Sequence, residues 1–261
     1  MNVDLVGKNA LVCGSSKGIG RAIAVELASL GANVIVAARS ADLLADIVTQ
    51  LPNSVPQNHG FLVIDMEDHD DLIKKVRTLV MTKPIHILIN NSGGPPGGPI
   101  LKAQPEEFTQ AMERHLIASH HLVGLLAPKM KKVGYGRIIN IISTSVKEPI
   151  AGLGVSNTTR GAMASWAKTV SMELAPFGIT VNNILPGFTR TERLESLVAT
   201  WADQRSLSTS EMESELYKSV PMGRFASPEE VGAVAAFLAT PSASYVTGVS
   251  LAVDGGRTKC L

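Results

Sequence analysis

The sequence predicts a doubly wound α/β domain, and three observations lead to this class. Short apolar runs rich in Val and Ile alternate with longer amphipathic stretches. A glycine-rich segment, residues 14–20, directly follows the first apolar run. The composition, 45% apolar and 18% charged, is that of a globular chain with a large core. Runs that are apolar on both sides are typical of buried parallel strands, and their alternation with helices indicates right-handed βαβ crossovers.

The alternation gives each element an expected place. Strands are expected at 9–13, 34–38, 61–65, 85–90, 137–142, 180–185 and 250–253. Helices are expected at 18–30, 43–51, 68–81, 105–131, 155–174 and 228–238. We therefore predict one Rossmann-type domain over residues 1–261, with a seven-stranded parallel sheet and helices on both faces.

Two segments interrupt this rhythm, the Gly/Pro-rich residues 93–99 and an insertion at 189–224. Ligands of open α/β sheets bind beyond the carboxyl ends of the strands, where such loops gather, so we interpret the insertion as a substrate lid. Within it, apolar residues recur at helical spacing, namely Leu194, Leu197, Val198 and Trp201. They either line an apolar pocket or seat the lid on the core.

Charge and cysteine content exclude several classes of function. Lysine and arginine (24) nearly balance aspartate and glutamate (23), so the basic stripe that nucleic acid or an anionic membrane requires is not expected. The sequence lacks an apolar run of the roughly 18 residues that a spanning helix needs. Cys13 and Cys260 suggest neither a disulfide framework nor a metal site. We expect a cytoplasmic protein with a small-molecule ligand.

The glycine-rich segment has the features of a dinucleotide phosphate site. It reads Gly14-Ser15-Ser16-Lys17-Gly18-Ile19-Gly20 and joins the first strand to the first helix. Glycines let the backbone turn tightly and approach a pyrophosphate, while the helix N-terminus offers amide donors and partial positive charge. The alternative is an ordinary glycine-rich turn, but its place in the first βα unit favours a cofactor.

The end of the second strand favours NADP(H) over NAD(H). No acidic residue stands where an NAD enzyme usually binds the adenosine ribose diol; the strand ends in Arg39 and Ser40 instead. Together with Lys17 these residues are expected to hold a 2′-phosphate, unless they form only a solvated cluster at the helix start. Asp65 and Met66, after the third strand, are candidates to contact the adenine, although Asp65 is also a plausible helix cap.

Further motifs follow in a fixed order along the chain. They are the segment from Gly14 to Gly20, Asn90-Asn91-Ser92-Gly93, Gly136-Arg137-Ile138-Ile139-Asn140, Pro186-Gly187 and Val253-Asp254-Gly255-Gly256. Together they resemble the short-chain dehydrogenase/reductase family, in its ketoacyl-carrier-protein-reductase-like branch. The likeness covers nearly the whole chain.

The resemblance implies further site residues and an assembly. It places Asn91, Ser92 and Gly93 in the cofactor site, and Pro186, Gly187 and Thr191 beside the nicotinamide, with Asn90 supporting the sheet. These positions are read from the matching motifs. It also implies a homo-oligomer, a tetramer formed through the long helices and the C-terminal strand.

The same resemblance shows an atypical catalytic set. Enzymes of this family reduce a carbonyl by hydride transfer, with a Tyr as proton donor, a Lys that lowers its pKa, a Ser that binds the carbonyl oxygen and an Asn that supports a proton path. On this chain the Ser position falls on Ser143, but the Tyr, Lys and Asn positions fall on Ser156, Arg160 and His115. Three of the four positions therefore depart from the family pattern.

These departures change the expected chemistry. An aliphatic hydroxyl is a far weaker acid than a phenol, and an arginine with a pKa above 12 binds anions but does not relay protons. Ser143, Ser156 and Arg160 are expected to form an oxyanion or carboxylate cradle, or else Ser156 and Arg160 hold only the cofactor or each other. His115 is either a displaced proton donor or a structural histidine. Tyr217, in the lid, is either a phenol supplied from above or lid packing.

Three hypotheses follow from these residues. The first is an NADP(H)-dependent oxidoreductase acting on a carbonyl or alcohol, with His115, Tyr217 or water as proton donor. The second is a catalytically altered cofactor-binding protein that serves as a sensor, scaffold or non-redox subunit. The third is a cofactor-assisted lyase or isomerase in which Arg160 grips a carboxylate.

Overall fold

A seven-stranded, entirely parallel sheet forms the centre of the computed structural model, which describes residues 1–260. The strand order is β3-β2-β1-β4-β5-β6-β7. Strands β2 and β3 lie on one side of β1 and strands β4 to β7 on the other, so the topological switch point lies between β1 and β4. The strands are β1 (Asn9–Cys13), β2 (Asn33–Ala38), β3 (Gly60–Val63), β4 (Ile87–Asn90), β5 (Gly136–Ile141), β6 (Ile179–Pro186) and β7 (Ser250–Val253). The predicted fold class is confirmed, and all seven strands lie within a few residues of their expected places.

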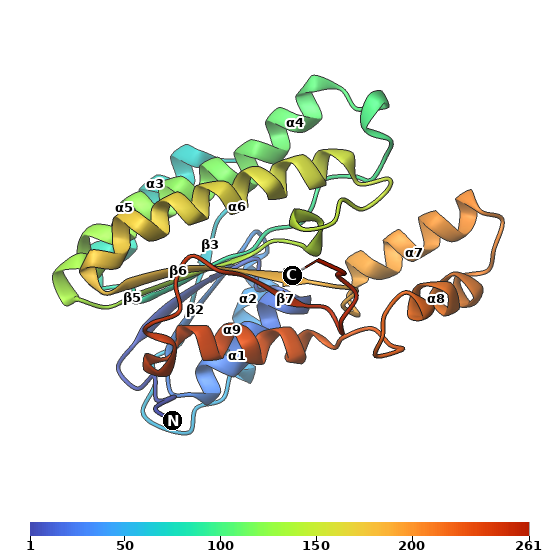
Figure 1. Cartoon of the computed structure of the whole chain (residues 1–261). Helices are drawn as coiled ribbons and strands as arrows, with labels where there is room; N and C mark the ends of the chain where they lie inside the picture. Colours follow the sequence, from blue (N-terminus) through green and yellow to red (C-terminus); the bar gives the residue numbers. More distant parts are fainter. Residues whose placement is uncertain (261) are drawn as a thin grey trace.

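Helices cover both faces of the sheet, and the helical insertion at residues 189–224, named the lid after its predicted role, extends beyond the carboxyl edge (Figure 1). One layer contains α3 (His69–Thr82), α4 (Pro105–Met112), α5 (Ala118–Val133) and α6 (Gly154–Leu174). The opposite layer contains α1 (Gly18–Ser29), α2 (Ala41–Gln50) and α9 (Pro228–Ala239). The lid contains α7 (Glu192–Gln204) and α8 (Thr209–Lys218). No helix in the described part of the chain is long and apolar enough to cross a membrane.

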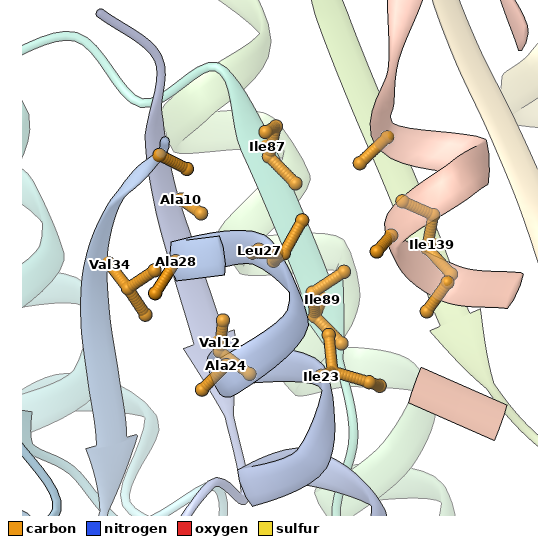
Figure 2. Close-up of a cluster of buried hydrophobic side chains, with 14 of the residues drawn as sticks. Ala10, Val12, Ile23, Ala24, Leu27, Ala28, Val34, Ile87, Ile89 and Ile139 are labelled. Carbon is orange, nitrogen blue, oxygen red and sulfur yellow. The ribbon is translucent and has the colours of Figure 1, made fainter. Parts of the chain in front are cut away.

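The strands are apolar on both sides because each sheet face packs against a helical layer. In Figure 2, Ile23 and Leu27 of α1 lie over Val12 of β1 and Ile89 of β4. Leu11, the neighbour of Val12 on β1, points to the other face and joins a separate core cluster. All five of these side chains are fully buried, and each contributes about 1.5–3 kcal/mol to folding. This burial on both faces fixes the central strands rigidly.

The long helix predicted at 105–131 is not one continuous α-helix. It is divided into α4 and α5 by a π-helical turn, Glu113–Ile117. A π-turn inserts an extra residue into the helical repeat and changes which side chains face inward, and such turns often occur at functional sites. Here the turn contains His115, which it buries against the protein interior. The apolar periodicity of the sequence carries no signal for this irregularity.

The insertion at 189–224 folds around a small core of its own. Leu194 and Val198 of α7 are buried there with Met212 of α8 and Phe225. The apolar spacing in the sequence therefore does reflect a helix that seats the lid. Two other members of that pattern, Leu197 and Trp201, line the cleft described below, so both alternatives hold for different residues.

A chain of amide hydrogen bonds crosses the carboxyl half of the sheet. Asn90 donates to Asn140 (2.8 Å), Asn140 donates to Asn183 (2.8 Å), and Asn183 donates to Ser250 (3.1 Å). These residues are register partners on β4, β5, β6 and β7. This row of hydrogen bonds pairs polar side chains that are otherwise costly to bury, and it fixes the strand ends that form the cleft floor.

Replacing Asn140 with Ala should break this chain at its centre. The variant leaves the Asn90 amide and the Asn183 carbonyl without their buried partner, which should cost about 2–4 kcal/mol of unfolding free energy in urea titrations. The control is Ser250→Ala, at the end of this row of hydrogen bonds. Only one bond is lost there, so the free energy of unfolding should fall by about 1 kcal/mol. Equal losses for the two variants would show that the chain has no special role.

Candidate cofactor and substrate cleft

A cleft of about 1410 Å³ opens at the carboxyl edge of the sheet, beneath the lid. It is lined by the loops after β1, β2, β4 and β5 and by the first part of α7. Eight lysine and arginine side chains line it against five carboxylates, although the whole chain has a formal net charge of only +1. This local excess of positive charge favours anionic ligands.

The glycine loop at one end of the cleft is packed too closely for side chains. A Cβ atom on Gly20 would lie 2.2 Å from the Gly14 carbonyl oxygen, and one on Gly14 would lie 2.6 Å from the Asn91 carbonyl oxygen. Gly14 and Gly18 also have positive φ angles, 59° and 55°. The Asn91 amide donates to the Gly14 carbonyl (3.1 Å) and ties this loop to β4. The result is a compact loop whose residues Gly14, Ser16, Lys17 and Gly18 line the cleft at the start of α1, where a phosphate can approach the backbone.

Two residues predicted to bind the cofactor instead lie beneath the loop. Ser15 is fully buried, and its hydroxyl accepts a hydrogen bond from the Ala37 amide of β2 (2.8 Å). Gly20 is buried against Gly14. Neither residue lines the cleft, so both act by shaping the loop. Their neighbours Gly14, Ser16, Lys17, Gly18 and Ile19 do line it.

The basic cluster predicted at the end of β2 is only partly assembled. Arg39 is exposed at the cleft wall beside Ser40, and it forms no salt bridge or side-chain hydrogen bond with any residue in the described range. Lys17 instead pairs with Glu192 at the start of α7, across the cleft mouth. Arg39 is therefore the cation of this cluster that is available to a ligand.

The remaining residues predicted at the cofactor site all line the cleft. They are Asp65, Met66, Asn91, Ser92, Gly93, Pro186, Gly187 and Thr191. Asp65 accepts a hydrogen bond from the Glu67 amide (3.1 Å), whereas the cap of α3 is Asp68. The alternative interpretation, in which Asp65 only caps the helix, does not agree with these contacts.

Arg160 extends from α6 to the floor of the cleft and is 7% exposed. Its Nη1 donates to the Ile141 carbonyl at the end of β5 (3.1 Å), while its Nε is buried without a hydrogen-bond partner in the described chain. Burial and the nearby positive charge of Arg193 lower the pKa of Arg160 to about 10. The guanidinium therefore remains charged at neutral pH, and it faces the cleft with N–H donors that make no hydrogen bond within the described chain.

Ser143 and Ser156 line the same part of the cleft as Arg160. The Ser143 Oγ accepts a hydrogen bond from the Ser145 amide (3.1 Å), which leaves its own hydroxyl proton free to donate. Ser156 precedes Arg160 by one helical turn on α6, so both side chains leave the same face of the helix. The structure thus brings together three of the four predicted catalytic residues.

His115, the fourth, is separated from the cleft lining. Its side chain is 3% exposed, and its Nδ1 lies 2.6 Å from the Ser92 hydroxyl, while its Nε2 has no hydrogen-bond partner in the described residues. Burial, then the positive charges of Arg160 and Arg114, lower the pKa of His115 to about 2. The imidazole is therefore neutral at working pH, and of the two interpretations of His115 the structural histidine agrees with these contacts.

No tyrosine of the described chain reaches the cleft. The Tyr217 hydroxyl accepts from Arg190 (2.7 Å) and donates to Glu213 (2.9 Å), and its ring packs on Phe225. Tyr135 donates to the Ala239 carbonyl, and Tyr245 lies fully exposed on the surface. Of the two interpretations of Tyr217, lid packing agrees with these contacts.

The structure adds a residue that the sequence argument missed. Arg193, on the first turn of α7, reaches back to the Gly/Pro-rich loop and donates to the Pro95 carbonyl (2.6 Å). The sequence identified both of these segments as probable parts of a site. It gave no signal that this particular arginine, among the several of the lid, turns toward Arg160.

Comparisons with known proteins agree with this architecture. A family model described as enoyl-(acyl carrier protein) reductase matches residues 14–258. The NADPH-dependent reductase BacG of Bacillus subtilis is 31% identical over 97% of this chain and 99% of its own length. The 3-oxoacyl-[acyl-carrier-protein] reductase FabG of Haemophilus influenzae is 33% identical over 96% and 98%. The structure of L-sorbose reductase from Gluconobacter frateurii, complexed with NADPH and L-sorbose, superimposes with a TM-score of 0.92 at 28% identity, covering all of both chains.

The depressed pKa of His115 makes a prediction about stability. Below pH 6.5 the unfolded chain protonates this imidazole, whereas the folded protein does not until about pH 2, so the free energy of unfolding should fall as the pH falls. The slope from this group is about 1.4 kcal/mol per pH unit, or about 2 kcal/mol between pH 6.5 and 5.

Urea titrations of His115→Gln over the same pH range should show this slope reduced. The matched control is His120→Gln, which removes an exposed imidazole of α5 and should retain the dependence of the unchanged protein. Identical slopes in all three proteins would contradict a buried, neutral His115.

Proposed function

The chain belongs to the short-chain dehydrogenase/reductase family, and from this membership we propose that it is an NADPH-dependent oxidoreductase that reduces a small-molecule carbonyl. One observation carries the proposal. A single cleft runs from the closely packed glycine loop and Arg39 to the group formed by Ser143, Ser156 and Arg160. It therefore joins a place for a phosphorylated dinucleotide to a place for a polar reacting group.

The residues of the glycine loop fit an NADPH phosphate group. Gly14 and Gly18 bring the loop backbone to the cleft surface at the start of α1, where a pyrophosphate would bind, and Arg39 is a free cation for the 2′-phosphate. The preference for NADP(H) over NAD(H) is also the one expected from the relatives, since BacG is named an NADPH-dependent reductase and the sorbose reductase was crystallised with NADPH. When bound, NADPH supplies the hydride.

Ser143 and Arg160 are proposed to stabilise the reacting oxygen. The Ser143 hydroxyl would donate to the carbonyl oxygen, because the Ser145 amide orients its Oγ while its proton makes no hydrogen bond within the described chain. Arg160 places a permanent positive charge in a buried part of the cleft, where negative charge that develops on that oxygen is stabilised more strongly than in water. Ser156 completes the polar wall beside them.

The proton is proposed to come from water that reaches this polar wall. His115 is buried behind Ser92 with a pKa of about 2, so it is neither placed nor charged to act as the acid. Tyr217 is engaged with Arg190 and Glu213 in the lid. Neither Arg160 nor an aliphatic serine hydroxyl is acidic enough to supply the proton itself. His115 is proposed to position Ser92 instead.

The same observation favours a second candidate function. The cleft contains the residues proposed to bind NADPH, but no phenol of the described chain lines it to act as a proton donor. A protein with such a site would bind NADPH without reducing a substrate, as a sensor, scaffold or non-redox subunit would. The two functions share the cofactor site and differ only in turnover.

We further propose that the chain works in the cytoplasm as a homotetramer. Apolar side chains are exposed near the last strand, where the family resemblance implies a subunit contact, and they include Phe237, Val249 and Leu251. Light scattering of the purified protein measures this assembly directly.

Replacing Arg39 with Gln should weaken NADPH binding by about tenfold, because one charge-assisted bond to the 2′-phosphate is lost. Binding of NADH, which lacks this phosphate, should be unchanged and is the internal control. The measurement is cofactor fluorescence titrated against each protein. A loss of affinity that is equal for both cofactors would remove Arg39 from the 2′-phosphate site.

The purified protein should oxidise NADPH in the presence of at least one member of a panel of ketones, aldehydes and 3-ketoacyl thioesters. Ser143→Ala should lower kcat/KM with that substrate by about a hundredfold, because it removes a donor to the developing oxyanion. Ser145→Ala, which keeps the backbone amide that binds Ser143, is the matched control. NADPH binding without consumption across the panel would favour the second candidate function.

A further inference from the structure

Two guanidinium groups from different parts of the chain meet at the Gly/Pro-rich loop. A Cβ atom placed on Gly94 would lie 3.8 Å from Nη2 of Arg160 and 3.8 Å from Nη2 of Arg193. Arg160 reaches this point from α6 and Arg193 from the lid helix α7. Each is fixed by a single main-chain carbonyl, Ile141 for Arg160 and Pro95 for Arg193.

This pair of cations has no anionic partner among residues 1–260. Among the residues that the structure describes, neither Arg160 nor Arg193 forms a salt bridge. Arg160 is in addition only 7% exposed, and its Nε has no hydrogen-bond partner among the described residues. Two positive charges held together in a partly buried site repel each other, and an anion bound between them offsets this repulsion.

The other end of the same loop is apolar. A Cβ atom on Gly97 would lie 3.4 Å from the Leu153 side chain and 3.9 Å from that of Leu197. Trp201 and Ile150 line the cleft as well. Gly97 follows Gly94 by three positions, and an extended chain spans at most about 3.6 Å per residue, so the two glycines are at most about 11 Å apart. The loop therefore joins a cationic end to an apolar end over the length of a small molecule.

We propose that the substrate is a keto acid with an apolar body, whose carboxylate binds between Arg160 and Arg193 and whose body packs on Leu153 and Leu197. This inference rests on the proposed function, since it names the substrate class of that carbonyl reductase. Both arginines offer the planar pairs of N–H donors that match a carboxylate. The net change adds a hydride and a proton across the C=O bond, so the keto acid becomes a hydroxy acid while its carboxylate is unaltered.

A competing ligand for the two arginines is a phosphate of the cofactor itself. The glycine loop and Arg39 already provide places for the pyrophosphate and the 2′-phosphate at the far end of the cleft. Arg193 is moreover directed to the Gly/Pro-rich loop by its bond to Pro95. A substrate carboxylate therefore fits the pair better, and the experiment below separates the two ligands.

The test compares keto acids with their methyl esters, which keep the carbonyl and the body but lose the negative charge. Pyruvate, 2-oxobutanoate, levulinate and phenylpyruvate are each titrated beside the corresponding ester into protein saturated with NADP⁺, which permits no reduction. Trp201, which lines the cleft, reports binding by its fluorescence, and calorimetry verifies the affinities. At least one acid should bind about tenfold or more tightly than its ester, as expected for a charge-assisted pair of bonds.

Arg193→Gln should remove this preference, lowering the affinity for the acid by about tenfold while that for the ester changes little. The matched control is Arg205→Gln, which replaces an arginine at the end of the same helix that pairs with Glu215 and does not line the cleft. It should bind acid and ester as the unchanged protein does. Affinity for NADP⁺, titrated separately, should be the same in all three proteins.

Three results would overturn the keto-acid inference. They are equal binding of every acid and its ester, including failure of both to bind; an Arg193→Gln variant that keeps the preference; and an Arg193→Gln variant whose main defect is weaker NADP⁺ binding, which would assign Arg193 to the cofactor. Steady-state assays with NADPH on the same pairs separate this outcome from failure of the proposed function. Reduction of the esters as readily as the acids would leave a reductase without this specificity, whereas tight acid binding without reduction would leave an acid-binding protein that is not a reductase.

Discussion

The parallel sheet, buried between two helical layers, is the constraint on which the rest of this protein depends. Because its strands run in one direction, the loops after β1, β2, β4 and β5 all emerge at one edge, and the functional residues of distant segments meet there. The Asn90–Asn140–Asn183 hydrogen bonds hold the strand ends in register just below this edge. The same hydrogen bonds therefore stabilise the sheet and fix the geometry of the cleft.

The cleft floor carries the positive charge of Arg160, and no phenol of the described chain lines it. A buried Arg160 beside serine hydroxyls stabilises negative charge well but transfers protons poorly, because its pKa, although lowered to about 10, remains well above neutrality. Such a site relies on electrostatics more than on acid catalysis. Arg193 adds a second positive charge near Arg160 at the Gly/Pro-rich loop. It also links the position of the lid to the site, since Arg193 and Glu192 both begin α7 and contact loops of the core.

Sequence reasoning was accurate where local patterns carry the information and failed where the outcome depends on an irregularity. The strands were found because burial on both faces requires uninterrupted apolar runs such as Val34 to Ala38. An unperturbed imidazole titrates near neutral pH, so the sequence left His115 either as a proton donor or as a structural histidine; the π-turn buries it beside Ser92 and near two arginines, which favours the structural role. Lys17 was expected at the 2′-phosphate, but Glu192 lies within its reach once the lid is folded.

The sequence by itself determined the fold class and the place of the glycine loop, because each is a property of one short segment or of its spacing from the next. Only the tertiary structure decided that Arg160 and Arg193 converge on Gly94, that Tyr217 is engaged within the lid and that Ser15 and Gly20 lie beneath the phosphate loop. Those facts depend on contacts between segments that are far apart in the chain. Such contacts are fixed by how helices pack on the sheet, which no local pattern records.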